Sequence, residues 1–280
     1  MTTRPLIGSH ATVTGGLAKG GLAYAAETGA EVIQVFVSNP RGWAPSAGDP
    51  GQDALIRDAP IPVFIHAMYL INFGAADEAI AAKSAQAIKH ALNRGRQIGA
   101  RGVVVHTGSA TGGDREKALR QVGELLCPVL DTLEETDPDL LLEPMAGQGT
   151  MLCARAEDIG PYLDALHRHP KVGLCLDTCH LFAAGHDLTK AGGVAETLHE
   201  VERAAGPGRI KLVHANDSQL GLGSNRDRHE AIGKGEIGVE PFRELLKHPM
   251  MQNVPFVAET PGGKSGHARD IALLKDLRDR

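Results

Sequence analysis

Six short apolar runs of this sequence each end on a histidine or a carboxylate, the side chains that most often bind metal ions or transfer protons. VGLCLD ends on Asp177, for example, and LLLE ends on Glu143. Asp and Glu number 34 and His 13 among 280 residues, so six such endings would arise by chance with a probability on the order of 10⁻⁵. The six residues are His66, His106, Glu143, Asp177, His214 and Glu259.

Two neighbouring motifs add three more potential ligands. In DTCH, His180 follows Asp177 by three residues, close enough to serve a neighbouring metal site. In NRDRHEAIG, Asp227 and His229 alternate as D-x-H, so both can reach one ion if the stretch is extended. The candidate set is therefore five histidines and four carboxylates: His66, His106, His180, His214, His229, Glu143, Asp177, Asp227 and Glu259.

Nine nitrogen and oxygen ligands are too many for one tetrahedral ion, and too many for two unless water is largely excluded. Shared among three ions, with one bridging carboxylate, they leave open positions for water and substrate. Mixed imidazole and carboxylate ligands suit zinc, manganese or iron, and the spacing does not choose among them.

One histidine such as His106 would by itself be read as structural, and one Asp at a strand end as a helix cap. Six together favour a site. Cys175 and Cys179 are interpreted as buried packing residues, and the remaining histidines as surface or packing residues.

The elements that must position these side chains are strands. Eight apolar runs alternate with amphipathic segments such as 84–102 and 114–135, without a linker or a composition break. This alternation predicts an α/β fold, a single (β/α)8 TIM barrel domain over residues 1–280, with the metal site at its C-terminal mouth. A doubly wound open sheet is the alternative, but GSHATVTGG is a poor match to its GxGxxG loop. The runs cover 6–10, 32–37, 62–66, 103–106, 140–143, 172–177, 210–214 and 255–259.

Composition and charge limit the expected cellular location of the protein and the kinds of partner it can bind. The N-terminus lacks a signal pattern, and no apolar stretch approaches the length of a membrane span. The four cysteines form no CxxC pair, so we expect reduced thiols in a cytoplasmic protein. A net charge of −5 argues against a nucleic-acid partner. Three divalent ions would add +6 against −4 from the four ligand carboxylates, which would make the mouth positive and remove that objection.

Several motifs together resemble the endonuclease IV family of apurinic/apyrimidinic (AP) endonucleases, over essentially the whole chain. They are LEPMAGQG, CLDTCHLFAAGHD, HANDS, DRHEAIGKGEIG and AETP. The resemblance implies a (β/α)8 barrel with three zinc ions, in part replaceable by manganese or iron. It implies a base excision repair enzyme that cuts double-stranded DNA 5′ to abasic sites by metal-activated water. The products would be a 3′-hydroxyl and a 5′-deoxyribose phosphate, and damaged 3′ ends would also be cleaned.

The resemblance also implies roles for residues. Glu143 would bridge two ions, and Glu143 and Glu259 would be the catalytic carboxylates. SNPRGW and HAMYLIN nominate Arg41 and Tyr69 as DNA-binding residues. The partner would be DNA damaged at an abasic site, with no obligate protein partner, and the protein would be a monomer associated with the nucleoid. The implied ligand sets are His66, His106 and Glu143; Glu143, Asp177, His214 and Glu259; and His180, Asp227 and His229.

The chain departs from the family pattern at a few positions. Pro144-Met145 stand where Asn-Thr is common, Thr107 where proline is frequent, and Gln219 where lysine is frequent; the last change removes one potential phosphate contact. A metal-dependent sugar isomerase or epimerase of the related barrel type is the alternative enzyme. It would need neither the Asp227–His229 pair nor the Arg41 and Tyr69 loops. A non-catalytic metal-binding or DNA-binding module is a third class.

Overall fold

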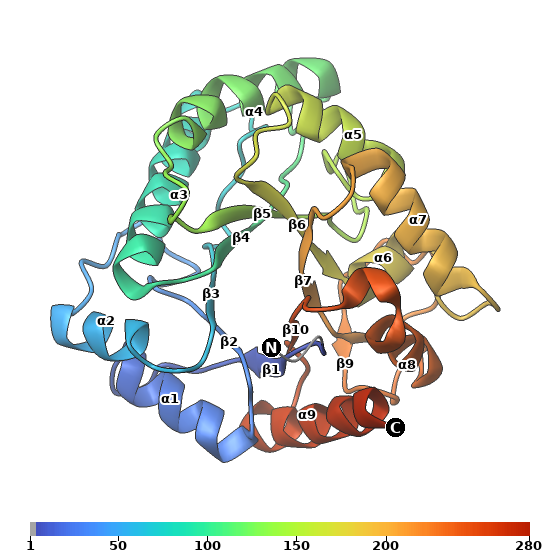
Figure 1. Ribbon diagram of the computed structural model, residues 1–280. Helices are drawn as coiled ribbons and strands as arrows, with labels where there is room; N and C mark the ends of the chain where they lie inside the picture. The colour runs from blue at the N-terminus through green and yellow to red at the C-terminus, as the bar shows by residue number, and fades with distance from the viewer. Residues whose placement is uncertain (1–3) are drawn as a thin grey trace.

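The computed structural model describes residues 4–280 and has a closed barrel of eight parallel strands at its centre, surrounded by helices (Figure 1). Around the barrel the order is β1-β10-β7-β6-β5-β4-β3-β2. All eight predicted runs are barrel strands, and the predicted (β/α)8 fold is confirmed. The strands are β1 (Ile7–His10), β2 (Ile33–Val35), β3 (Val63–His66), β4 (Gly102–His106), β5 (Asp139–Glu143), β6 (Val172–Asp177), β7 (Ile210–His214) and β10 (Phe256–Ala258).

The outer layer consists of helices that pack their apolar faces on the strands. None of the helices within residues 4–280 has both the length and the apolar character needed to cross a bilayer. Their bounds are α1 (Leu17–Thr28), α2 (Pro50–Arg57), α3 (Glu78–Ile98), α4 (Arg115–Leu130), α5 (Ala156–Ala165), α6 (Thr178–Ala184), α7 (Gly193–Ala205), α8 (Glu240–Lys247), the 3₁₀ turn η1 (Pro249–Met251) and α9 (Gly263–Asp279).

The two helices expected from periodicity both exist, with shifted ends. α3 begins six residues earlier than the expected start at 84, because the Asp77 side chain accepts the N–H groups of Ala79 and Ile80. It stops at Gly99, which adopts φ 67°. α4 ends at Leu130, short of the expected 135. Leu133 beyond it lies in a turn and still packs on the core, so the apolar periodicity outlasts the helix.

The barrel interior is filled by one apolar layer, and the candidate site lies directly above it. Alternate residues of a strand point to the same side, so the residue two positions after each apolar filler also points inward. In seven strands that residue is polar, and in β1 the same face carries Leu6, Gly8 and His10. The fillers are Val32, Phe64, Val104, Leu141, Cys175, Leu212 and Val257. The residues above them are Gln34, His66, His106, Glu143, Asp177, His214 and Glu259.

A small antiparallel ribbon covers one side of the mouth. It pairs β8 (Asp217–Ser218) with β9 (His229–Glu230). The buried Asp217 carboxylate accepts four backbone N–H groups, those of Ser218, Gly233, Gly235 and Ile237, at 2.8–3.1 Å. A Cβ at Gly235 would lie 2.3 Å from the Ser218 carbonyl oxygen, so only glycine fits there. The GKGEIG segment is therefore folded around one carboxylate.

Candidate metal centre

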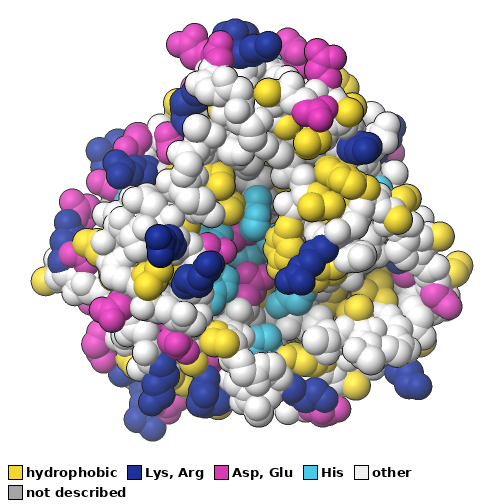
Figure 2. All heavy atoms as spheres, turned by 180° about the vertical axis from the view of Figure 1, so that it is seen from behind, with side chains coloured by type: hydrophobic (Ala, Val, Ile, Leu, Met, Phe, Trp, Pro, Cys, Tyr) yellow, Lys and Arg dark blue, Asp and Glu magenta, His cyan; other side chains and the backbone are white. Residues whose placement is uncertain are grey.

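All nine predicted ligands meet at the mouth of the barrel. Figure 2 shows a central hollow in which histidines and acidic side chains gather. The three sets implied by the family resemblance are among the groups that the fold brings together, and the ligand atoms of each set lie within 4.8 Å of one another. The sets are His66, His106 and Glu143; Glu143, Asp177, His214 and Glu259; and His180, Asp227 and His229.

Glu143 belongs to two of the three sets. Its Oε2 lies 3.2 Å from His66 Nε2 and 3.6 Å from His106 Nε2. Its Oε1 lies 3.1 Å from His214 Nδ1 and 3.4 Å from His180 Nδ1. The carboxylate is 1% exposed, so water cannot compensate its charge. A carboxylate with one oxygen in each set is the arrangement that a bridging ligand requires.

Asp177 serves the backbone and the site at once. Oδ1 accepts the N–H of His180 at 2.9 Å and caps α6. Oδ2 accepts from Asn216 Nδ2 at 2.7 Å and lies 3.4 Å from His229 Nε2. The helix-cap role and the site role are therefore divided between the two oxygens of one side chain.

The third set fits a cation on the evidence of its nitrogens. The Nε2 atoms of His180 and His229 are buried and have no hydrogen-bond partner among the described residues. Oxygens of Asp227 lie 3.2 and 3.0 Å from them without forming a hydrogen bond. Buried nitrogens normally have a partner. Two unpartnered imidazole nitrogens beside a carboxylate match the ligand chemistry of a divalent ion.

The protonation of the site is set by burial and by the clustered charges. Burial lowers the pKa of His106 to about 4, which keeps its imidazole neutral, the form that binds a metal. Burial also opposes a charge on His180, but Asp177, Asp227 and Glu143 outweigh it and raise the pKa of His180 to about 9. The pKa of Glu259 is lowered, because nearby imidazoles outweigh its burial, so its carboxyl is ionised. An apo site of this kind holds protons that a metal ion would displace.

Three polar residues of the site were missed by the sequence analysis. His10 and Gln34 complete the mouth on β1 and β2, where Gln34 lies between Glu259 and His214. Asn216 donates to Asp177 and accepts the N–H of Glu259 at 2.8 Å. A signal for His10 existed, because the run LIGSH also ends on a histidine. Gln34 lies inside a strand, and Asn216 lies after one, so no spacing rule singled them out.

Tyr69 and Arg41 lie on adjoining loops at the rim. The Tyr69 N–H donates to the Pro40 carbonyl at 3.0 Å, which ties the two loops together. The Tyr69 ring stacks on His106 with centroids 5.7 Å apart, yet 48% of the residue is exposed. Arg41 is exposed, and its side chain forms no hydrogen bond within residues 4–280. Both residues are accessible to a large ligand above the mouth.

The positions that depart from the family pattern have local partners. The Thr107 hydroxyl donates to the Cys153 carbonyl at 3.0 Å. The Pro144 carbonyl lies 3.1 Å from His180 Nδ1, where it orients that ring. Gln219 donates to the His229 carbonyl at 3.0 Å, so its amide braces the ribbon. Cys179 lies close to Asp177 and His229, but burial raises the pKa of its thiol to about 11, which disfavours the thiolate form.

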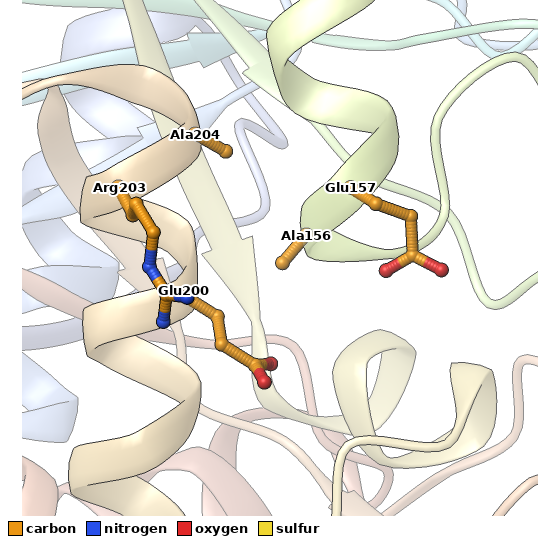
Figure 3. Close-up of a pocket in the computed structure, with 5 residues that line it drawn as sticks. All are labelled: Ala156, Glu157, Glu200, Arg203 and Ala204. Atoms are coloured by element: carbon orange, nitrogen blue, oxygen red, sulfur yellow. The ribbon is translucent and has the colours of Figure 1, made fainter.

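The site opens into a cavity of about 430 Å³. It is lined by seven of the nine candidate ligands together with Tyr69, Met145 and Gln148. A separate hollow of about 310 Å³ lies between α5 and α7, with Glu157, Glu200 and Arg203 around it (Figure 3). No candidate ligand lines that second hollow.

Comparisons with known proteins match this chain to one fold and to proteins named as endonucleases. The family model for xylose isomerase-like TIM barrels matches residues 22–277. The probable endonuclease 4 of Streptomyces avermitilis is 56% identical over 283 residues, covering 99% of this chain and 91% of that protein. The crystal structure of endonuclease IV from Thermus thermophilus superimposes with a TM-score of 0.86 at 31% identity, covering 98% of this chain and 99% of that one.

A sugar-enzyme relative shares only the fold. The structure of a D-tagatose 3-epimerase-like protein superimposes with a TM-score of 0.72 at 16% identity, covering 98% of this chain and 97% of that one. The full-length identity to the endonucleases is much higher. On these matches, and within the xylose isomerase-like TIM barrels, the chain belongs to the endonuclease IV family.

Proposed function

We propose that this protein is a DNA repair endonuclease that hydrolyses the phosphodiester 5′ to abasic sites in double-stranded DNA. It uses three zinc ions, with manganese or iron able to replace zinc in part. It leaves a 3′-hydroxyl and a 5′-deoxyribose phosphate, and the same site cleans blocked 3′ ends. The observation that carries the proposal is the grouping of nine candidate ligands into three adjacent sets, two of which share Glu143, at the opening of one cavity. The names of the relatives support the reaction class.

The residues of this chain would hold the three ions in the sets described above. When bound, the ions supply Lewis acidity toward the phosphate and make a water molecule more acidic. Glu143 and Glu259 act as the catalytic carboxylates. Glu143 is fixed by contacts at both oxygens, and Glu259 by Gln34 and Asn216. Neither needs to reorganise during the reaction, which is the condition for electrostatic preorganisation.

The exposed edge of the site is where the substrate would enter. Side-chain exposure is 20% for His106 and 35% for Asp227, whereas His66 and Glu143 are almost fully buried. Tyr69 and Arg41 would contact the duplex beside this edge. An abasic nucleotide needs no base to be unpaired or unstacked before it turns into the cavity, so its flipping costs less than that of an intact nucleotide. This difference would supply the selectivity.

The wider biology follows from the same proposal. The protein would act as a monomer in the cytoplasm, associated with the nucleoid, on DNA as its partner and without an obligate protein partner or a membrane. A sugar isomerase or epimerase remains the alternative enzyme. The third ligand set, His180, Asp227 and His229, and the Tyr69 loop argue against it, because a small polyol needs neither.

The deciding experiment uses the zinc-replete protein and a duplex with one abasic analogue, beside the matched intact duplex, each with and without prolonged chelation. We expect a single cut 5′ to the analogue, lost after chelation and absent from the intact duplex. Ketose–aldose isomerisation and 3-epimerisation of a free sugar are assayed on the same preparation. Sugar conversion without DNA cleavage, by protein shown to hold its metal, would replace this proposal with the alternative.

A further inference from the structure

Two of the eight barrel strands supply no predicted ligand, yet both place a polar residue at the level of the site. β1 supplies His10 and β2 supplies Gln34, above the same apolar layer as the ligands of the other six strands. Gln34 is completely buried. Burying an amide destabilises the folded protein unless each of its polar atoms has a hydrogen-bond partner. The contacts of Gln34 therefore indicate its role.

The two ends of the Gln34 amide are assigned by their neighbours. One end lies 2.6 Å from Glu259 Oε1 and the other lies 2.8 Å from His214 Nε2. An ionised carboxylate only accepts hydrogen bonds, so the amide nitrogen must face Glu259. The amide oxygen must then face His214. Reversing the amide would set two oxygens against each other.

This assignment determines the tautomer of His214. Because an amide oxygen only accepts, His214 Nε2 must carry the proton and donate it to Gln34. When the ring is neutral, as a metal ligand must be, Nδ1 is the atom with the free lone pair. It is the nitrogen that faces the carboxylates, 3.1 Å from Glu143 Oε1 and 3.4 Å from Glu259 Oε2. The lone pair therefore points into the second ligand set.

The same amide also gives the two Glu259 oxygens different roles. Oε1 is occupied by Gln34 and lies 3.4 Å from His10 Nδ1. The second amide hydrogen of Gln34 is directed at that His10 nitrogen, 3.1 Å away. Oε2 is left facing the ligand set. One side chain thus orients two of the four members of that set.

We infer that Gln34 is a positioning residue that fixes the Nδ1-ligating tautomer of His214 and reserves Glu259 Oε2 for the ion held by Glu143, Asp177, His214 and Glu259. The inference rests on the proposed metal sites, because His214 Nδ1 must give up its proton before it can bind an ion. Residues that orient metal ligands typically change metal affinity by about 10–100-fold when removed.

The test compares Gln34→Met, Gln34→Glu and a matched control, Ser9→Ala. Met is close to Gln in shape but cannot form the hydrogen bonds to Glu259, His214 and His10. Glu can still accept from His214 Nε2 but places a carboxylate against Glu259. Ser9 is buried on the neighbouring strand, and its hydroxyl has no hydrogen-bond partner within residues 4–280, so its removal deletes a buried polar group without breaking a described contact.

The first readout is the Nε2–H group of His214, measured by long-range ¹H–¹⁵N correlation spectra of zinc-loaded, histidine-labelled protein, with His214→Asn identifying the signal. We expect the hydrogen-bonded Nε2–H signal in wild type, Ser9→Ala and Gln34→Glu, and loss or displacement of that signal in Gln34→Met, which removes its acceptor. An unchanged Nε2–H signal in Gln34→Met would overturn the inference. This result does not depend on whether the protein cuts DNA.

The second readout is zinc affinity by competition with a chromophoric chelator. Gln34→Met is expected to bind one of three ions about 10–100-fold more weakly and the other two normally. Gln34→Glu is expected to bind that ion more weakly as well, because it places a second carboxylate against Glu259 and loses the hydrogen bond to His10, although it keeps the acceptor for His214. Three ions of wild-type affinity in Gln34→Met would refute the role of Gln34. A wild-type protein that binds zinc but fails to cut abasic DNA would refute the proposed function and leave the role of Gln34 standing.

Discussion

At the scale of single residues, Glu143 is the side chain on which the site depends most, because its two oxygens face different sets of imidazoles. His66 and His106 lie beside Oε2, and His214 lies beside Oε1. An amide at this position would keep the size and shape of the side chain but replace one acceptor oxygen with a donor. Both sets that share the residue would then lose their common carboxylate.

Glu143→Gln is therefore expected to reduce incision of abasic duplex by about 10³-fold or more, because several kcal/mol of transition-state stabilisation depend on the bound metal. Zinc content should fall by more than one ion per chain, as measured by elemental analysis. Glu157→Gln, in the hollow between α5 and α7, is the control and should leave both values unchanged. Full zinc content with full activity in Glu143→Gln would contradict a bridging role.

Tyr69 offers a separate prediction, about substrate binding. Its ring covers His106 and remains half exposed. Tyr69→Ala should raise KM for abasic duplex roughly tenfold, since an aromatic contact to nucleic acid contributes about 1–3 kcal/mol. Tyr69→Phe keeps the ring and should stay close to wild type. Zinc content of both variants should be unchanged, and a loss of zinc in Tyr69→Ala would assign the ring a role in the metal site instead.

At the scale of elements, strand geometry and one ribbon build the site. Because strand side chains alternate with a period of two residues, a polar side chain lies above each apolar filler of the barrel. The barrel strands therefore form the base of the candidate site. The third ligand set needs a further element, since Asp227 and His229 lie outside the barrel. β9 carries His229 to the mouth by pairing with β8, where Ser218 faces His229.

Asp217→Asn tests whether the ribbon holds that set in place. The buried carboxylate accepts four N–H groups, and an amide can accept at only one of its two ends. We expect a loss of at least ~3 kcal/mol in the free energy of unfolding, because charged hydrogen bonds are broken and buried donors are left unpaired. Urea denaturation measures it. Ser224→Ala is the control, because the buried Ser224 hydroxyl has no hydrogen-bond partner in the described part of the chain. Equal stability of the two variants would contradict the prediction.

At the scale of the whole molecule, the start and end of the described chain are joined by one ionic cluster below the barrel. Glu31 Oε2 accepts from the Ile7 N–H at 3.0 Å and from Arg278 on α9 at 2.6 Å. Burial alone would raise the pKa of Glu31, but Arg278 and the Ile7 N–H outweigh it and lower that pKa. A carboxyl with a lowered folded-state pKa stabilises the protein above its unfolded pKa of ~4.3.

Glu31→Gln should therefore lower the free energy of unfolding at pH 7 by about 1–2 kcal/mol, the range of charged hydrogen bonds that are partly solvated. The difference from wild type should shrink as the pH falls below ~4.3 and through the lower folded-state value, because the wild-type carboxyl is then protonated as well. Urea titrations at pH 7, 5 and 3.5 measure it. A difference that is independent of pH would mean that the charge of Glu31 contributes nothing.

Charge balance gives the last prediction at this scale. The four carboxylates at the mouth are balanced either by bound ions or, without metal, by protons on neighbouring imidazoles such as His180, so removal of metal costs the folded protein the free energy of ion binding. Zinc at 100 times its Kd stabilises a folded protein by about 2.7 kcal/mol, which corresponds to roughly 5–10 °C in Tm for a chain of this size. Calorimetry before and after chelation, with zinc added back as the control, should show a drop of that order and its recovery.

The sequence by itself determined the barrel and placed the candidate ligands at its mouth. Eight apolar runs at regular spacing determined the strands, and a polar residue at a strand end must lie at the mouth because parallel strands all end at the same side. His66, Glu143 and Glu259 could therefore be predicted from order along the chain. The motif resemblance divided them into sets, which the strand pattern alone left open.

Tertiary structure decided what surrounds those ligands. Gln34 became part of the site only because the closing of the barrel brings β2 beside β1, and thus beside Glu259, which is 225 residues away in the chain. The same holds for Asp217, whose four partners are backbone groups that carry no residue type to recognise. A ligand is marked in sequence by its own chemistry, whereas an orienting partner is defined by distance and direction, and these exist only in the folded chain.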